Sequence, residues 1–439
     1  MNSEDQNLVN PEEFEIRDKR YFQIDVIKAA MIFLVIYDHT IPWVIKGEIG
    51  VALWERISIP VFLVIMGFNM GLSFSKNKDQ RFRTFYSWKY FKRKFWRYVY
   101  PFIILYLVSS LIGLAINGFE WNALNQYKKD GWHFFNLFTG ILLFWGPGNW
   151  FLPVIFWSIL LLPLLYKGFS GKILPIITAI LIHFNILVIL LSLVLGIYQF
   201  LPIMFCTLFF LPFLSIGFSS KLVWRIFALF LCYAIEISLQ LTIFIIFPAP
   251  FLTWQAYYDF MYWYLFIVTT PFFMLSAIGL GMWFSKKPNI FAKQNIFIWI
   301  LFPLSLYYLI QYQFFDFRFD FIRGDYNLFV FPYSAFLVLL GIKLLPRKWD
   351  HWFGRAISTI GKSTYHILLT QILYFSVVYS VYGDHYGASI FGINTSYDLT
   401  IYLYLIINWL ICIPCGVFWY YVDLKIRDYY LRRKKNTPP

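Results

Sequence analysis

The chain has 439 residues, of which 60% are hydrophobic, 23% are aromatic and only 14% are charged. A soluble domain carries about 25% charged residues, so this composition excludes an ordinary globular protein and is typical of a polytopic membrane protein. The net charge of +14 does not indicate nucleic-acid binding, because no stretch alternates basic and aromatic residues on a soluble scaffold.

The N-terminal residues 1–20 are polar and mostly acidic, and they lack the basic start and apolar centre of a cleavable signal peptide. We expect a cytoplasmic tail here, then one transmembrane domain at 21–425 and a basic cytoplasmic tail at 426–439. The cysteines are Cys206, Cys232, Cys412 and Cys415. All fall inside apolar runs, so we expect neither a disulfide framework nor a metal site.

Apolar stretches long enough to span a membrane recur along the whole chain, since a spanning helix needs about 20 such residues. They are 22–43, 51–74, 97–117, 150–166, 172–196, 200–218, 222–247, 260–284, 292–314, 328–345, 362–382 and 398–421. A further apolar piece at 133–145 is short and is expected at the membrane interface or dipping into it. The pattern predicts an all-α fold, a polytopic transmembrane helical bundle of about 10–12 spans.

Basic residues gather in every second connection between these stretches, as cytoplasmic loops require. They are Lys76, Lys78, Arg81, Arg83, Lys89, Lys92, Arg93, Lys94 and Arg97, then Lys167 with Lys172, Lys221 with Arg225, Lys286 with Lys287, and finally Lys343, Arg347, Lys348, Arg355 and Lys362. The intervening connections carry few or balanced charges. Both termini are therefore expected in the cytoplasm, and the protein is expected in the plasma membrane as a multi-pass protein.

The first span carries four ionisable groups, Asp25, Lys28, Asp38 and His39. His39 lies about 16 Å beyond Lys28 along a helix, almost three whole turns, so Asp25, Lys28 and His39 share one face. Asp38 points about 100° away from His39, which predicts a poor partner for the imidazole.

Two interpretations of this face are open. Asp25 and Lys28 could pair near the inner membrane interface while His39 makes a helix contact. Alternatively, a cation near the inside and an imidazole deeper in the membrane suit an anionic substrate from the cytoplasm and base chemistry. The shared face favours the second interpretation.

The first span resembles the start of the acyltransferase 3 family of integral membrane O-acyltransferases, in which an Asp, an Arg and a His occupy these places. Asp25 and His39 match, and Lys28 stands in place of the arginine. Lysine keeps the charge but loses the two-pronged hydrogen-bonding geometry of a guanidinium.

Four later segments resemble the same family in the same order, so the similarity extends from about residue 20 to 425. They are "ISIPVFLVIMGFNMGLSFSKNK" at 57–78, with Met66 in place of a serine; "FKRKFWRYVYPF" at 91–102, with Arg93, Arg97 and Pro101; "GNWFLPVIFWSILLLPLL" at 148–165; and "IGKSTYHILLTQILYF" at 360–375, with Gln371 where a histidine is common. In the first of these, Gly67 and Gly71 have the spacing of close helix packing.

The resemblance implies transfer of an acyl group, notably acetyl, from cytoplasmic acyl-CoA as co-substrate to a hydroxyl of a cell-surface or lipid-linked glycan, without a permanently bound cofactor. His39 would be the catalytic base. Lys28, Arg93 and Arg97 would bind the CoA phosphates, and Asp25 and Trp150 would contact substrate.

Other interpretations remain open. Arg93 and Arg97 could serve topology alone, and Trp150 could be an interfacial anchor. His366 and Glu236, also at membrane depth, are expected to be satisfied core groups. The whole chain could instead be a transporter or flippase of polysaccharide or lipid precursors without covalent chemistry, or a catalytically inactive membrane scaffold. The sequence does not indicate an oligomeric state.

Overall fold

A computed structural model describes residues 21–76, 82–116, 118–119, 148, 151–168, 274–315, 329–382 and 400–436. These residues form helices and connecting turns, and the described ranges contain no β-strand. The helices are α2 (Phe22–Thr40), α3 (Trp43–Glu48), η1 (Val51–Leu53), α4 (Ser58–Ser75), α5 (Phe82–Phe85), α6 (Trp88–Lys94), η2 (Phe95–Val99), α7 (Tyr100–Ile116), α10 (Phe151–Gly168), α16 (Leu275–Ser285), η6 (Lys293–Asn295), α17 (Ile296–Phe314), α18 (Phe331–Leu344), α19 (Trp352–Tyr382) and α20 (Thr400–Asn436).

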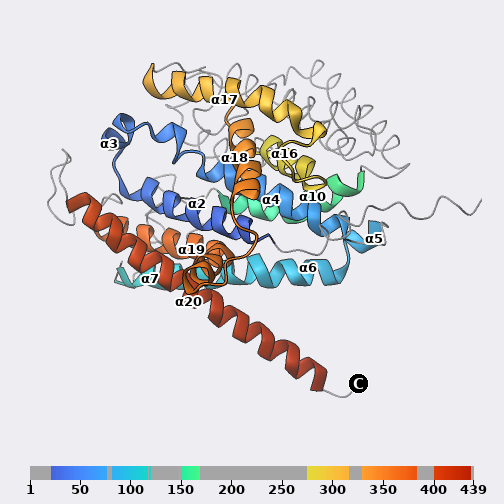
Figure 1. Cartoon of the computed structure of the whole chain (residues 1–439). Coiled ribbons are helices and arrows are strands. Elements are labelled where there is room, and N and C mark those ends of the chain that lie inside the picture. Colours follow the sequence, from blue (N-terminus) through green and yellow to red (C-terminus); the bar gives the residue numbers. More distant parts are fainter. Residues whose placement is uncertain are drawn as a thin grey trace, which may run out of the picture.

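Helices α2 and α4 run through the middle of the described bundle, with α17 on one side and α6, α7 and α19 on the other (Figure 1). Helix α20 crosses this second side, and its C-terminal part extends beyond the other helices. The bundle is therefore built around the helix that carries His39.

The pair α4 and α16 owes its close packing to glycines. A Cβ added at Gly67 would lie 1.9 Å from the backbone oxygen of Ile278, and one at Gly281 would lie 1.9 Å from that of Val64. A Cβ at Gly71 would lie 2.2 Å from the hydroxyl oxygen of Ser285. No side chain fits at these distances, which confirms the packing role predicted for Gly67 and Gly71.

Helices α2 and α19 run in the same direction, and α20 runs opposite to both. Near the start of α2, the backbone of Asp25 abuts Gly361 on α19. At its end, Thr40 accepts a hydrogen bond from the Asn408 amide on α20, 2.9 Å long, and Asn408 accepts one from the Tyr374 hydroxyl on α19, 2.8 Å long. These buried polar contacts fix the register of the three helices next to His39.

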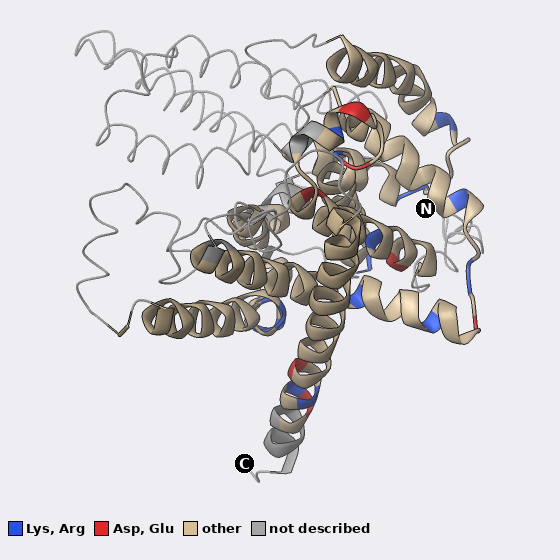
Figure 2. Ribbon diagram, turned by 90° about the vertical axis from the view of Figure 1, so that its left-hand side faces the viewer, with Lys and Arg blue, Asp and Glu red and all other residues tan. Residues whose placement is uncertain are grey.

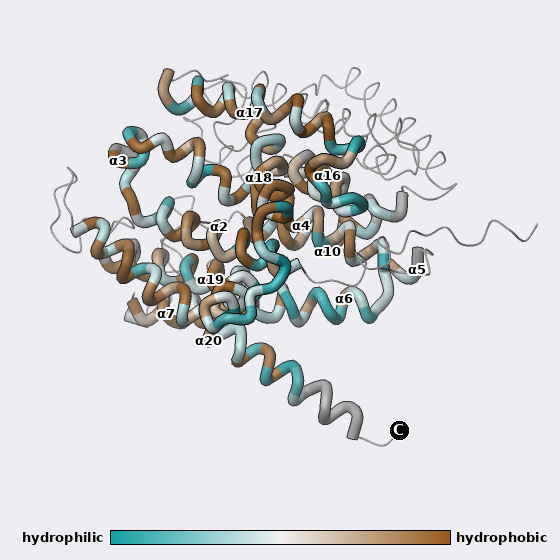
Figure 3. Tube along the Cα trace, in the orientation of Figure 1, coloured by the Kyte–Doolittle hydropathy of each residue, from teal (hydrophilic) through white to brown (hydrophobic). Residues whose placement is uncertain are grey.

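Apolar side chains cover the outer faces of several helices. On α7, Ile103, Leu107 and Leu111 recur at the spacing of one helix turn and are exposed. In the described ranges, four helical segments are long and apolar enough to cross a membrane: Val51–Ser75, Trp88–Ile116, Lys293–Phe314 and Thr400–Tyr429. The hydrophobic stretches along these helices, and the charged residues near helix ends and connections, are visible in Figures 2 and 3. Exposed apolar faces of this length are those that lipid covers.

Every predicted span except 172–196, 200–218 and 222–247 overlaps a described helix; those three, with the 133–145 piece, lie outside the described residues. Three helical segments extend well beyond their predicted bounds. The continuous helix formed by α6, η2 and α7 begins at Trp88, before residue 97. Helix α19 begins before residue 362, and α20 continues beyond residue 421 to Asn436. Hydropathy marks only the apolar part of a helix, and each extension contains charged residues outside that part: four basic residues before Phe95, Arg355 in α19, and the charged end of α20.

Candidate functional site

Three of the segments singled out in the sequence meet around His39. The histidine lies near the end of α2, Gly148 lies three residues before α10, and Gln371 lies in the middle of α19. The imidazole also packs edge-on against Phe375 on α19, with ring centroids 6.1 Å apart. Residues separated by more than 300 positions in the sequence thus form one local site.

Gly148 is the closest point between these segments. Its φ of +86° is one that only glycine adopts readily. A Cβ at this position would lie 3.2 Å from Gln371 Nε2, 3.3 Å from Leu368 Cδ1 and 4.0 Å from His39 Nε2. We call the point where this Cβ would stand the space beside Gly148; it faces both Gln371 and His39, and a methyl group would fit there only if its neighbours shifted.

Gln371 is completely buried, with an exposed fraction of 0%. Neither its amide nitrogen nor its amide oxygen has a hydrogen-bond partner among the described residues. Buried amides are almost always paired in proteins, so this side chain is available to a group that enters the space beside Gly148.

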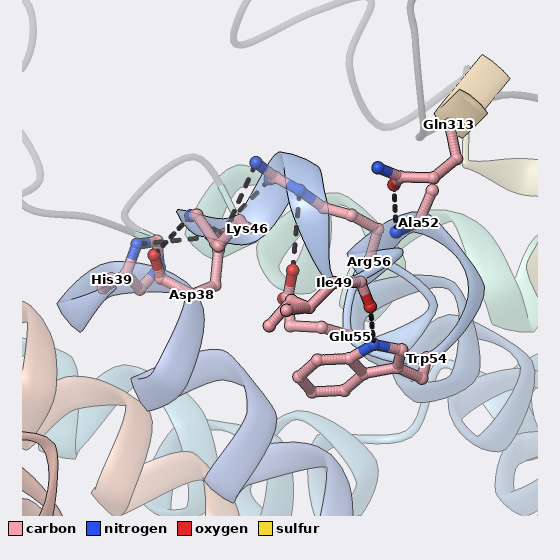
Figure 4. Close-up of polar contacts among 9 residues, drawn as sticks. All are labelled: Asp38, His39, Lys46, Ile49, Ala52, Trp54, Glu55, Arg56 and Gln313. Atoms are coloured by element: carbon pink, nitrogen blue, oxygen red, sulfur yellow. Dashed lines mark hydrogen bonds and ion pairs between the residues drawn. The ribbon is translucent and has the colours of Figure 1, made fainter. Parts of the chain in front are cut away.

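A buried cluster of charges lies on the other side of His39 (Figure 4). The Lys46 ammonium donates to an Asp38 carboxylate oxygen at 2.5 Å and to the Asp38 carbonyl at 2.7 Å. Arg56 approaches Asp38 at 3.4 Å and Glu55 at 3.5 Å. Two cations and two carboxylates balance here, as burial of charge requires.

Asp38 faces the Nδ1 nitrogen of His39, and the Nε2 nitrogen faces Gly148. Its Oδ2 lies 3.7 Å from His39 Nδ1, which is longer than a hydrogen bond but close enough to favour a proton on that nitrogen. Nε2, on the Gly148 side, then carries the lone pair that a base uses. The sequence predicted that Asp38 is a poor partner for His39, and the 3.7 Å distance is consistent with this prediction. Lys46 lies closer to Asp38 than His39 does.

The predicted donor end lies at the other end of α2. Lys28 Nζ is 3.8 Å from an Asp25 carboxylate oxygen, and Asp25 also accepts a hydrogen bond from the Ser358 hydroxyl at 3.2 Å. The side chain of Asp25 is 8% exposed and that of Lys28 15%. Asp25 thus joins α2 to α19, while Lys28 keeps part of its surface accessible.

Arg93 and Arg97 are exposed on the continuous helix formed by α6, η2 and α7. Arg97 lies within η2, a five-residue π-helix, a distortion often found at functional sites. Between them, Lys94 turns inward, with its ammonium 3.4 Å from the Met70 sulfur on α4. The next residue after Arg97, Tyr98, packs on Tyr365 of α19, four residues beyond the Gly361 that abuts Asp25. Tyr98, next to Arg97, and Asp25, three residues before Lys28, thus contact the same part of α19.

His366, the other histidine candidate, does not join the His39 site. His366 Nε2 is 2.7 Å from an Asp423 carboxylate oxygen, and both side chains are buried between α19 and α20. This agrees with a satisfied core group. Trp150, Glu236, Cys206 and Cys232 lie outside the described residues. In the described ranges, no group of three or more His, Cys, Asp or Glu side chains is placed to hold a metal ion.

Lys46, Glu55 and Arg56 were not among the sequence candidates. Lys46 falls between the first two predicted spans, and Glu55 and Arg56 fall at the start of the second, all within "IKGEIGVALWER", where balanced charges resemble an ordinary outer loop. These charged residues alternate with apolar residues, which is unusual for a solvated loop and could have indicated that they are buried. The pairing of Lys46 and Arg56 with Asp38 depends on the chain turning back toward the end of α2 after Thr40.

Comparison with known proteins gives a family match over part of the chain. No curated protein and no solved structure matches the chain. Residues 21–199 match the family model of the acyltransferase 3 family, described as an acyltransferase domain. The matched range includes His39, Gly148 and the whole buried charge cluster. The match confirms the resemblance of the motifs that lie within residues 21–199, and the chain is a membrane protein in which these residues match the acyltransferase 3 family.

Proposed function

We propose that the protein is an O-acyltransferase of the plasma membrane that moves an acyl group, most simply acetyl, from cytoplasmic acyl-CoA to a hydroxyl of a cell-surface or lipid-linked glycan. The observation that carries this proposal is the meeting of His39, Gly148 and Gln371 at one point of the bundle. Acyl transfer needs a base and a hydrogen-bond donor on either side of the reacting carbonyl, and this site offers both.

His39 is the general base in this proposal. Its Nε2 takes the proton of the acceptor hydroxyl as the oxygen attacks the thioester carbonyl, and returns a proton to the departing thiolate. Asp38 keeps the imidazole in the required tautomer from the Nδ1 side. Lys46 and Arg56 neutralise Asp38, so that its charge does not turn the imidazole into a permanent ion pair.

The donor binds from the opposite end of α2. Lys28, Arg93 and Arg97 supply cations for the CoA phosphates, and Asp25 orients Lys28. Lys28 and His39 lie about 16 Å apart along α2, a separation suited to the extended pantetheine arm between the CoA phosphates and the thioester. Trp150, two residues after Gly148, is proposed as a further substrate contact.

The test is acyl transfer by the purified protein in lipid nanodiscs. Release of free thiol from acetyl-CoA, together with an acetylated product seen by mass spectrometry of methyl hexoside acceptors, would support the proposal. Cells with and without the gene, compared by mass spectrometry of their surface glycans and lipids, would identify the natural acceptor. Glycan movement across the membrane without any loss of acetyl-CoA would support the transporter alternative instead.

A further inference from the structure

Gln371 carries an amide that the fold itself does not use. The side chain is fully buried on α19, and both of its polar atoms lack a partner among the described residues. Its neighbours on the helix are satisfied: the Thr370 hydroxyl donates to the His366 carbonyl at 2.9 Å, and the Ser376 hydroxyl to the Ile372 carbonyl at 2.6 Å. An unpaired buried amide destabilises a fold, so its position calls for a ligand.

The geometry defines where that ligand lies. Gln371 Nε2 and His39 Nε2 lie 3.2 Å and 4.0 Å from the point where a Cβ on Gly148 would stand. The two nitrogens are therefore at most about 7 Å apart, so a reacting group held between them would lie within hydrogen-bond reach of both.

Helix α10 adds a second favourable element at the same place. The Phe151 amide donates to the Gly148 carbonyl at 3.1 Å, so the N-terminal end of this 18-residue helix begins beside the space. The positive end of a helix dipole favours negative charge. Gln371 and α10 together thus make this space suited to a group that becomes anionic.

We propose that the Gln371 amide donates the hydrogen bond that stabilises the oxyanion of acyl transfer; this inference rests on the proposed function. As the acceptor oxygen bonds to the thioester carbon, its proton moves to His39 Nε2, and the carbonyl electrons move onto the oxygen that Gln371 binds. When the carbonyl re-forms, the carbon–sulfur bond breaks and His39 returns the proton to sulfur. The products are an ester and a free thiol.

The experiment compares Gln371→Leu and Gln371→Met with the parent, in nanodiscs, using acetyl-CoA as donor and methyl hexosides as acceptors. Loss of an oxyanion donor typically lowers kcat about 10²–10³-fold, and we expect this loss with an unchanged KM for acetyl-CoA. Gln371→His, which keeps an N–H donor, should recover part of the rate. Ser376→Ala is the matched control, a buried polar group of the same helix that bonds only to its own backbone in the described contacts.

Thermal unfolding separates a catalytic role from a structural one. Leucine and methionine remove an unpaired amide, so we expect melting temperatures equal to or above the parent's. Parental kcat in both variants, or a loss of rate matched by loss of folded protein, would overturn the assignment of Gln371 while leaving the acyltransferase proposal intact. A parent that releases no thiol with any acceptor would instead contradict the proposed function.

Discussion

Gly148→Ala tests the meeting of segments on which the site depends. The φ of +86° disfavours any side chain, and a left-handed conformation costs a non-glycine residue about 1–2 kcal/mol. The added Cβ would also press on Gln371 and Leu368, at 3.2 Å and 3.3 Å. Both neighbours must then shift by a few tenths of an ångström, away from the point that His39 faces.

The expected result is a loss of turnover larger than the loss of stability explains. Misplacement by about 1 Å in an active site can lower the rate about 10²-fold, so we expect a decrease of about 10-fold to 10²-fold in thiol release from acetyl-CoA. Gly118→Ala is the control, because Gly118 also has a positive φ, +65°, but has no atom within 4 Å of its Cβ position. Both variants should have a strained backbone at the substituted residue, but only Gly148→Ala should lose activity.

Turnover and thermal unfolding of both variants would be measured in nanodiscs at matched protein concentration. A Gly148→Ala protein as active as Gly118→Ala would refute the reasoning, because it would mean that the space beside Gly148 is not where the reaction occurs.

Three further predictions concern the donor end, the core and the topology. Lys28→Ala should weaken acyl-CoA binding by about 1.5–3 kcal/mol, the scale of a charge-assisted hydrogen bond, whereas Lys28→Arg should retain or improve the affinity. Isothermal titration with acetyl-CoA would measure both affinities, and an alanine variant with parental affinity would mean that Lys28 is only a membrane anchor. Gly67→Leu should separate α4 from α16 and lower the melting temperature, with about 1–3 kcal/mol or more lost to overpacking, and a parental melting curve would contradict the contact with Ile278. A cysteine at Asn77 should react with a membrane-impermeant reagent only after permeabilisation and one at Asn122 in intact cells, and labelling at position 77 from outside would reverse the assigned orientation.

Much of the helical fold follows from the sequence, because a membrane span is a run of apolar residues whose length the bilayer sets. The glycine pair of α4 was predictable for a similar reason, since its spacing alone specifies close packing. The start of α19 and the end of α20 were not predictable, because hydropathy does not show whether a less apolar segment continues a helix or forms a loop.

The site was predictable in its parts and not in its assembly. His39 was predictable because an imidazole is costly inside a membrane. The segments that contain Gly148 and Gln371 were predictable because they resemble family motifs. Their proximity depends on the parallel packing of α2 and α19, which local pattern does not determine. The pairing of Lys46 and Arg56 with Asp38 depends on a connection whose charges resemble those of a solvated loop.

The most direct test of the account is the turnover of His39→Gln beside His39→Ala and the parent, with acyl product measured by mass spectrometry at matched expression. Glutamine keeps hydrogen bonding but cannot accept the proton, and general-base catalysis contributes about 10²–10⁴-fold. The account predicts that both variants lose turnover by about that factor while folding, membrane insertion and acetyl-CoA binding stay close to parental. A His39→Gln protein that acylates at nearly the parental rate would show that His39 is structural and would contradict the central claim.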